Sequence, residues 1–267
     1  MIELSVVICT YNRDKYLPDA LESLKKQDAN PGAFEVIVIN NNCTDKTAAI
    51  CEKFAQKHPE LNFRHIVETS QGLSFARNRG IKESKANLIA FIDDDAIAEP
   101  DYVSRLLHAF DNYPEFDAVG GKVLPIYPGG QEPEWMSKYI QRLVSKVDDG
   151  DSFKEFKKKY PVGCNMAFKK SVFKETGVFN TDLTLRSDDK YIFSKLKKKR
   201  KKTIYAPDVV VHHNIEQYRL EHDFIKALSR LNGHTEYLRL KREPKYLLFF
   251  KHIDFMLKII ASLLIGV

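Results

Sequence analysis

Three consecutive carboxylates, Asp93, Asp94 and Asp95, directly follow the apolar run at residues 88–92. This order predicts a buried strand that ends in acidic side chains at the carboxyl edge of a sheet, where open α/β sheets bind their ligands. Asp93 and Asp95 occupy alternate positions and can share one divalent cation, and hard oxygen ligands favour Mg²⁺ or Mn²⁺ over Zn²⁺. The alternative for the triplet on its own is a solvated turn before a helix that begins near Asp101.

Polar side chains also follow two earlier expected strands, at residues 4–9 and 34–39. The first set offers an aromatic face for stacking a base, with amide and guanidinium groups for a phosphate: Thr10, Tyr11, Asn12 and Arg13. The second set offers side-chain amides that could pair with a pyrimidine edge: Asn40, Asn41 and Asn42. Thr44 or Asp45 is expected to cap the helix that follows.

A fourth segment begins at Gly72 and Leu73, which open a helix expected over residues 73–84. Arg77 lies one turn into this helix, from where it could reach back to the same edge of the sheet. Each of the four segments, taken alone, has an ordinary explanation as a turn or a cap. Because the carboxyl ends of parallel strands meet at one edge, the four together predict a nucleotide site.

The elements that position these residues alternate between strand and helix over the first 125 residues. Further strands are expected at residues 62–67, 88–92 and 118–123, and further helices through Leu17, Leu21 and Leu24 and after Asp45. Continuous apolar strands that alternate with helices predict an α/β fold with a mainly parallel central sheet, covered by helices on both faces.

The second half of the chain is less regular. Pro and Gly residues over 125–133 predict a boundary or surface excursion, and residues 139–160 are expected to form one helix or a mobile loop. Regular structure is expected to resume at residues 163–168, with a helix around 190–199 and a strand at 203–211.

Composition excludes several classes of protein. The 267 residues are 43% hydrophobic and 29% charged, which fits a soluble globular protein rather than a disordered or membrane-embedded one. The net charge of +6 combines −7 over residues 1–137 (14 Lys and Arg, 21 Asp and Glu) with +13 over residues 138–267 (28 against 15). The four cysteines lack metal-binding spacing, and no signal peptide is recognised, which predicts a reducing, cytoplasmic location.

The apolar segment at residues 246–267 is interrupted by Lys251, His252, Asp254 and Lys258. On a helix, one side would carry Phe249, Phe250, Ile253, Leu257 and Ile260. This pattern suits either packing on the core or lying in a membrane interface. The basic runs at 157–159 and 195–202 are either solvated faces or contacts for anionic headgroups or an acceptor's pyrophosphate. They lack interleaved aromatic residues, so nucleic acid is not expected as a partner.

In these motifs the chain resembles the family 2 glycosyltransferases, which have the GT-A fold, over about residues 3–215. The matching segments are residues 7–13, 40–47, 72–78, 93–95, 163–168, Asp188 with Asp189, and 205–213. The resemblance implies an inverting transfer from a nucleotide-diphosphate sugar, most often a UDP sugar. It implies that Asp189 is the catalytic base, which takes the proton of the acceptor hydroxyl.

The resemblance also implies a metal site and a nucleotide site. Asp95, Asp93 and His213 would hold Mn²⁺ or Mg²⁺, with His212 as the other candidate histidine. The nucleotide-binding residues would be Thr10, Tyr11, Asn12, Arg13, Asn40, Asn42, Gly72, Leu73, Arg77, Asp93 and Asp94.

The chain departs from the family pattern at two positions and in one motif. Asn40 stands where the family usually has the Asp that pairs with the base, and Asp188 replaces the usual Glu. The Q-x-x-R-W element of processive synthases is absent, which indicates the addition of one sugar per encounter.

We therefore expect residues 1–124 to form a nucleotide-sugar-binding half and residues 125–215 the acceptor-binding and catalytic half of one GT-A domain. Residues 216–267 would be a helical extension that either packs on the core or contacts an anionic membrane at the inner, cytoplasmic face. The expected function is transfer of one sugar to a glycan or lipid-linked acceptor in surface polysaccharide or glycolipid synthesis. The alternatives are a sugar nucleotidyltransferase and a non-catalytic nucleotide- or membrane-binding module.

Overall fold

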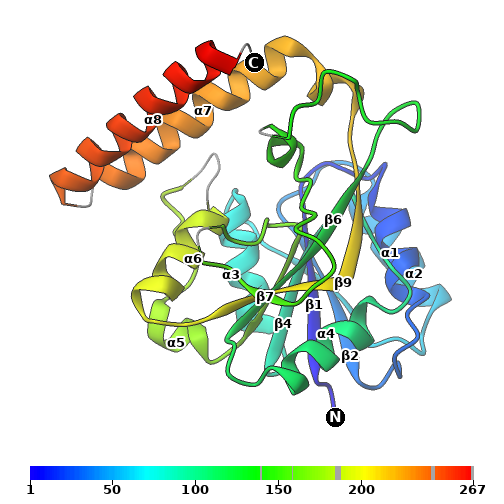
Figure 1. Ribbon diagram of the computed structural model, residues 1–267. Coiled ribbons are helices and arrows are strands. Elements are labelled where there is room, and N and C mark those ends of the chain that lie inside the picture. The colour runs from blue at the N-terminus through cyan, green and yellow to red at the C-terminus, as the bar shows by residue number, and fades with distance from the viewer. Residues whose placement is uncertain (139, 158, 184–187, 242–243, 266–267) are drawn as a thin grey trace.

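A nine-stranded sheet forms the centre of the protein in the computed structural model, which describes residues 1–138, 140–157, 159–183, 188–241 and 244–265 (Figure 1). The strand order is β3-β2-β1-β4-β8-β6-β9-β5, and β7 pairs with β9. The strands are β1 (Leu4–Thr10), β2 (Phe34–Asn40), β3 (Phe63–Val67), β4 (Leu88–Asp93), β5 (Ala96–Ala98), β6 (Ala118–Ile126), β7 (Lys154–Glu155), β8 (Asn165–Lys169) and β9 (Thr203–Asn214).

Helices cover both faces of this sheet. They are α1 (Leu17–Lys25), α2 (Thr47–Lys57), α3 (Leu73–Glu83), α4 (Tyr102–Asn112), α5 (Val172–Thr176), α6 (Asp188–Lys198), α7 (His222–Lys241) and α8 (Lys245–Ile265), with two 3₁₀ turns, η1 (Gln141–Val144) and η2 (Gln217–Leu220). One core layer joins the sheet to α1, α2 and α4, and the other joins it to α3, α5 and α6. The α/β fold expected from the sequence is confirmed.

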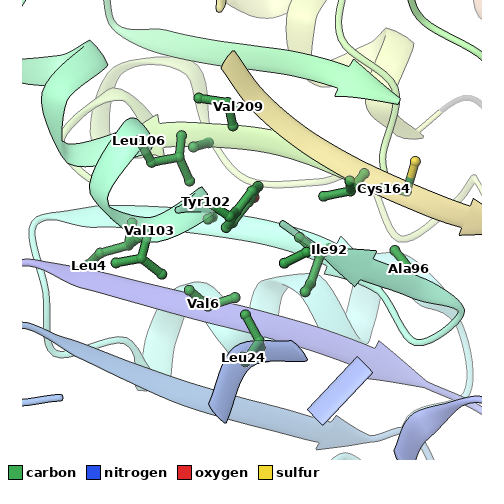
Figure 2. Packing of buried hydrophobic residues seen from close by; sticks show 14 of the residues in the cluster. Leu4, Val6, Leu24, Ile92, Ala96, Tyr102, Val103, Leu106, Cys164 and Val209 are labelled. Carbon is green, nitrogen blue, oxygen red and sulfur yellow. The ribbon is translucent and has the colours of Figure 1, made fainter. Parts of the chain in front are cut away.

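The helix α4 shows why these segments become helices. Its buried residues recur at helical spacing, at Tyr102, Val103, Leu106, Ala109 and Phe110, so one stripe of the helix can face the sheet. Figure 2 shows Tyr102 in the middle of this core layer, among Ile92 of β4 and Val209 of β9.

The strands β1, β2, β3 and β4 form the parallel part of the sheet, as expected. All seven residues of β2 are buried, because helices pack on both faces of this part. The register pairs Thr10 with Asn40 and Cys9 with Asp93. The ends of three strands that carry the predicted site residues therefore lie side by side.

The rest of the sheet is mixed, but its longest pairing, between β6 and β9, is also parallel, so most paired residues of the sheet lie in parallel strands, as expected. β8 runs antiparallel to both of its neighbours, β4 and β6, and β5 and β7 both run antiparallel to β9. The strand β5 was not expected, because its three residues are too few to show a strand pattern in the sequence. Its pairing of Ala96 with His213 brings the end of β9 to the acidic triplet.

The segment between β6 and β8 is held by side-chain contacts rather than by a long helix. Apart from residues 139 and 158, which lie outside the described residues, the expected helix or loop at 139–160 is irregular, with η1 and β7 inside it. Glu132 organises it by accepting hydrogen bonds from Tyr127 (2.9 Å), Gln141 (2.9 Å) and Lys146 (2.5 Å).

The helices α7 and α8 form an antiparallel pair at the end of the sheet opposite the N-terminus (Figure 1). Among the described residues, no helix combines the length and apolar character needed to cross a membrane. The α8 side chains that the sequence grouped on one face are exposed, so packing of this face on the core, one of the two alternatives, is wrong.

Candidate active site at the carboxyl ends of the parallel strands

The predicted metal ligands come together at the end of β4. Asp93 ends β4 and Asp95 directly precedes β5, whose pairing with β9 places His213 beside Asp95. The His213 Nε2 atom lies 3.2 Å from Asp95 Oδ1. Ligand atoms of Asp93, Asp95 and His213 all lie within 4.8 Å of one another, so the three side chains could hold one metal ion.

Two buried atoms of this cluster support a bound cation. Among the described residues, Asp95 Oδ1 and His213 Nδ1 have no hydrogen-bond partner. A buried polar atom without a partner is costly, and a cation at this position would supply a partner for the carboxylate oxygen. The donor set therefore fits a divalent metal.

His212, the other candidate ligand, lies elsewhere. Successive residues of a strand point to opposite faces, so His212 faces away from Asp95. Its Nε2 atom lies 2.5 Å from Glu99 Oε1. The structure thus places His213, and not His212, beside Asp95, a distinction that the sequence alone did not make.

Two arginines compensate the acidic cluster. Arg13 Nη2 lies 2.5 Å from Asp95 Oδ2, and Arg13 Nε lies 3.2 Å from Asp94 Oδ1. Arg219 Nη1 lies 3.9 Å from Asp95 Oδ2. Burial acts to raise the pKa of Asp95, but His213, Arg13 and Arg219 outweigh it and lower that pKa. Burial raises the pKa of Asp94 to about 7, although Arg13 opposes this change.

Sequence reasoning missed Arg219 and Glu216, which lie in and just before η2. Glu216 Oε2 lies 3.9 Å from Arg13, and Tyr16 donates a hydrogen bond to Glu216 Oε1 (3.2 Å). No local pattern at residues 216–219 indicates this position, because it depends on where β9 ends.

The asparagines at the strand ends hold the loops in shape. Asn12 and Asn42 have positive φ angles of 51° and 63°, a conformation that asparagine tolerates better than most residues. Asn12 Oδ1 accepts the backbone N–H of Thr44 (2.8 Å), and Asn40 Oδ1 accepts that of Cys43 (2.8 Å). The predicted pairing of Asn40 and Asn42 with a base stays a prediction.

Asn41, one of the three amides considered for pairing with a base, joins these loops to α3. Its Oδ1 accepts the backbone N–H of Gly72 (2.8 Å), and its Nδ2 donates to the carbonyls of Glu68 (3.1 Å) and Ser70 (2.7 Å). Gly72 has φ of 137°, which side chains rarely adopt. Only the run of three asparagines after β2 hinted at this role.

A pocket of about 500 Å³ lies between these loops and the start of α3. Its lining consists of Cys9, Thr10, Tyr11, Asn41, Gln71, Gly72, Leu73 and Ala76. Tyr11 is 51% exposed and Leu73 is 45% exposed, so an aromatic and an aliphatic surface are open to a flat ligand. Of the predicted nucleotide-binding residues, Thr10, Tyr11, Gly72 and Leu73 meet in this pocket.

Arg77 lies beneath the acidic cluster and is 3% exposed. Its guanidinium makes an ion pair with Asp188 and lies 3.7 Å from Asp93 Oδ1. A Cβ added at Gly163 would crowd the guanidinium, so a larger residue at this position would require Arg77 to shift. Arg77 thus balances the charges of these carboxylates, and the nucleotide contact predicted for it stays a prediction.

Asp189 lies in the first turn of α6, next to Asp188. Burial raises the pKa of Asp189 to about 6, the charge of Asp188 adds to this effect, and Arg77 opposes it. A carboxylate with this pKa is ionised near neutral pH and accepts a proton more readily than an ordinary aspartate. The backbone N–H of Lys190 donates to Asp189 Oδ1 (2.6 Å).

Comparison with known proteins gives a family match over most of the chain. Residues 5–177 match the family model described as glycosyl transferase family 2. The chain is 27% identical over 247 residues to a glucosyl-dolichyl phosphate glucuronosyltransferase of Haloferax volcanii, a match that covers 88% of this chain and 76% of that protein.

Two solved structures share the fold. The mannosyltransferase PcManGT from Pyrobaculum calidifontis, in complex with GDP-Man and Mn²⁺, superposes with a TM-score of 0.63 at 22% identity and covers 80% of this chain and 57% of that one. Residues 1–349 of TarS from Staphylococcus aureus, in complex with UDP, give 0.60 at 20% identity and cover 80% and 61%.

Proposed function

The chain belongs to glycosyl transferase family 2 and is a glycosyltransferase with the GT-A fold, and from this premise we propose a metal-dependent, inverting transfer of one sugar per encounter. The donor is a nucleotide-diphosphate sugar, with UDP as the first candidate nucleotide. The acceptor is a hydroxyl of a glycan or lipid-linked sugar in surface polysaccharide or glycolipid synthesis. The family match does not support the alternatives of a sugar nucleotidyltransferase or a non-catalytic module.

The observation that carries this proposal is the group of Asp93, Asp95 and His213, in which the buried Asp95 Oδ1 accepts no hydrogen bond from the described residues. The two carboxylates suit Mg²⁺ or Mn²⁺, and the imidazole favours Mn²⁺, since Mg²⁺ prefers a shell of oxygen ligands. When bound, the metal would offset the negative charge that develops on the departing diphosphate.

The protein's own residues would position the donor beside this cluster. Tyr11 offers a ring for stacking the base, and Thr10 and Gly72 line the same pocket. Arg13 and Arg219 hold Asp95 in its orientation through their charges. The side-chain oxygen of Asn40 already accepts a hydrogen bond from the backbone N–H of Cys43. The preferred nucleobase of the donor is therefore a question for measurement.

Asp189 would act as the general base. It takes the proton of the acceptor hydroxyl as that oxygen forms a bond to the anomeric carbon, on the side opposite the leaving group. The bond between this carbon and the phosphate oxygen breaks, and the nucleoside diphosphate leaves with the electron pair. One displacement of this kind inverts the configuration of the anomeric carbon.

The acceptor class is supported by the name of the Haloferax relative, which acts on a dolichyl-phosphate-linked sugar. We propose that this chain likewise uses a lipid-linked acceptor at the inner, cytoplasmic face of the plasma membrane.

A thermal-shift panel tests the donor site, with UDP, GDP, CDP and dTDP measured with and without Mn²⁺. Ligand at 100 times its Kd should add about 2.7 kcal/mol to the free energy of unfolding. For a chain of this size that corresponds to a rise in Tm of about 5–10 °C. A Mn²⁺-dependent rise in Tm with one nucleotide supports the proposal and identifies the nucleobase of the donor. No rise in Tm with any of the four nucleotides contradicts the proposal.

A further inference from the structure

The outer face of α8 is a stripe of largely exposed apolar side chains. It consists of Tyr246, Phe249, Phe250, Ile253, Met256, Leu257 and Ile260, which we call the α8 stripe. These side chains are between 40% and 63% exposed. At 100° per residue, all seven fall within about 120° of the helix circumference, with no polar residue among them.

The opposite side of α8 mixes polar and apolar residues, and several of them are partly buried. Leu247, Leu248, Lys251 and Asp254 are partly buried there, and Lys251 Nζ makes an ion pair with Asp254 Oδ2 (2.8 Å). The helix therefore presents its apolar face outward, the reverse of a surface helix on a soluble core. An exposed apolar surface of this kind marks an interaction site.

The charge of the helical pair indicates the partner. Residues 222–265 carry eight Lys and Arg against four Asp and Glu, a net charge of +4. A second copy of the chain would bring like charges together, whereas anionic lipid headgroups would attract them. Aromatic and aliphatic side chains beside basic residues are typical of helices that lie in a bilayer interface.

We propose that α8 docks the protein on an anionic lipid bilayer, with the α8 stripe lying at the boundary between headgroups and acyl chains. The physiological role of this contact rests on the proposed function, since a lipid-linked acceptor is met only at a membrane. The contact itself does not depend on catalysis.

The docked helices are joined to the candidate catalytic helix. Lys190 Nζ lies 2.5 Å from Glu236 Oε2, which connects α6 to α7 one residue after Asp189. The helical pair also lies at the end of the sheet toward which β1 runs, as Figure 1 shows. A bilayer bound by α8 would thus lie at the same end of the sheet as the candidate active site. A lipid-linked acceptor must approach the active site from a membrane.

Sedimentation with vesicles of phosphatidylglycerol and phosphatidylcholine tests the proposal, with the full chain and no nucleotide. The wild-type chain should bind these vesicles and bind pure phosphatidylcholine more weakly. Phe250→Asp should lower vesicle affinity about tenfold or more, because an aromatic side chain contributes at least that factor when it leaves water. Phe255→Asp is the matched control, since Phe255 is 42% exposed on the same helix but lies off the stripe.

Three results would overturn the proposal: no binding of the wild-type chain to anionic vesicles, equal losses for the two variants, or a lipid-free dimer that Phe250→Asp dissociates without changing vesicle affinity. Circular dichroism of each variant checks that α8 and the domain remain folded. The nucleotide panel, run on the same samples, separates the two proposals, because vesicle binding without any nucleotide shift would reject the donor site and leave the docking surface standing.

Discussion

The guanidinium of Arg77 makes an ion pair with the carboxylate of Asp188 inside the protein and joins α3 to α6. Their side chains are only 3% and 9% exposed. The same guanidinium lies 3.7 Å from Asp93, so one buried cation faces both the candidate metal cluster and the residue before Asp189. This contact fixes where the first turn of α6 stands relative to the end of β4.

Loss of the Arg77 charge should destabilise the protein strongly. Arg77→Met removes the positive charge that compensates the carboxylates of Asp93 and Asp188. Breaking a buried ion pair in this way lowers the free energy of unfolding by about 3–5 kcal/mol. Arg79→Met is the matched control on the same helix, because the Arg79–Glu83 pair is partly exposed and should be worth about 0.5 kcal/mol or less. Urea denaturation measures both, and equal losses would show that the Arg77 contact is not a buried ion pair.

The two neighbouring histidines should differ in metal binding. His213→Ala removes a predicted ligand and should weaken Mn²⁺ binding by at least about tenfold, whereas His212→Ala removes only a contact to Glu99 and should leave the affinity within about twofold. Electron paramagnetic resonance of free Mn²⁺ gives both dissociation constants without an activity assay. The reverse order of the two variants would mean that the metal does not bind at the Asp93, Asp95 and His213 cluster.

The first half of the fold and the position of the site could be predicted from local sequence. The apolar runs of β1, β2 and β4 and the polar residues after them indicated one edge of a parallel sheet, and the register confirms that these ends are neighbours. Helical spacing likewise predicted α1, and Leu17, Leu21 and Leu24 are buried as expected.

The remainder depends on contacts between distant segments. Asp95 meets His213 only because β5, three residues long, pairs with the end of β9. Arg219 reaches Asp95 only because the chain turns into η2 at that place. The antiparallel placement of β8 between β4 and β6 is also set by the whole sheet, since its five residues have no pattern that gives a direction.

The pH dependence of turnover should report Asp189. Because burial raises the pKa of this carboxyl to about 6, the base form is lost below that pH, and kcat/KM should fall about tenfold per pH unit on the acidic side. The profile is measured with saturating Mn²⁺ and limiting donor. A kcat/KM that does not change between about pH 5 and about pH 7 would contradict an essential base with this pKa.

The same pKa predicts the effect of Asp189 on stability. A carboxyl whose pKa is higher in the folded state stabilises the protein at low pH, and this contribution is lost as the pH rises through about 6. Asp189→Asn removes a buried charge that is unfavourable at neutral pH and should therefore not lower Tm at pH 7. Thermal denaturation at this pH checks the expectation, and a clear drop would show that the ionised carboxylate is a structural partner.

The measurement that tests the central claim most directly is sugar transfer by Asp189→Asn, followed together with donor binding to the same variant. We predict that transfer of the sugar to the acceptor, measured as acceptor-dependent release of nucleoside diphosphate, falls by at least about 10²-fold, while donor affinity stays within about twofold of the wild-type value. Turnover within about tenfold of wild type, with the donor bound normally, would contradict the account and remove Asp189 as the catalytic base.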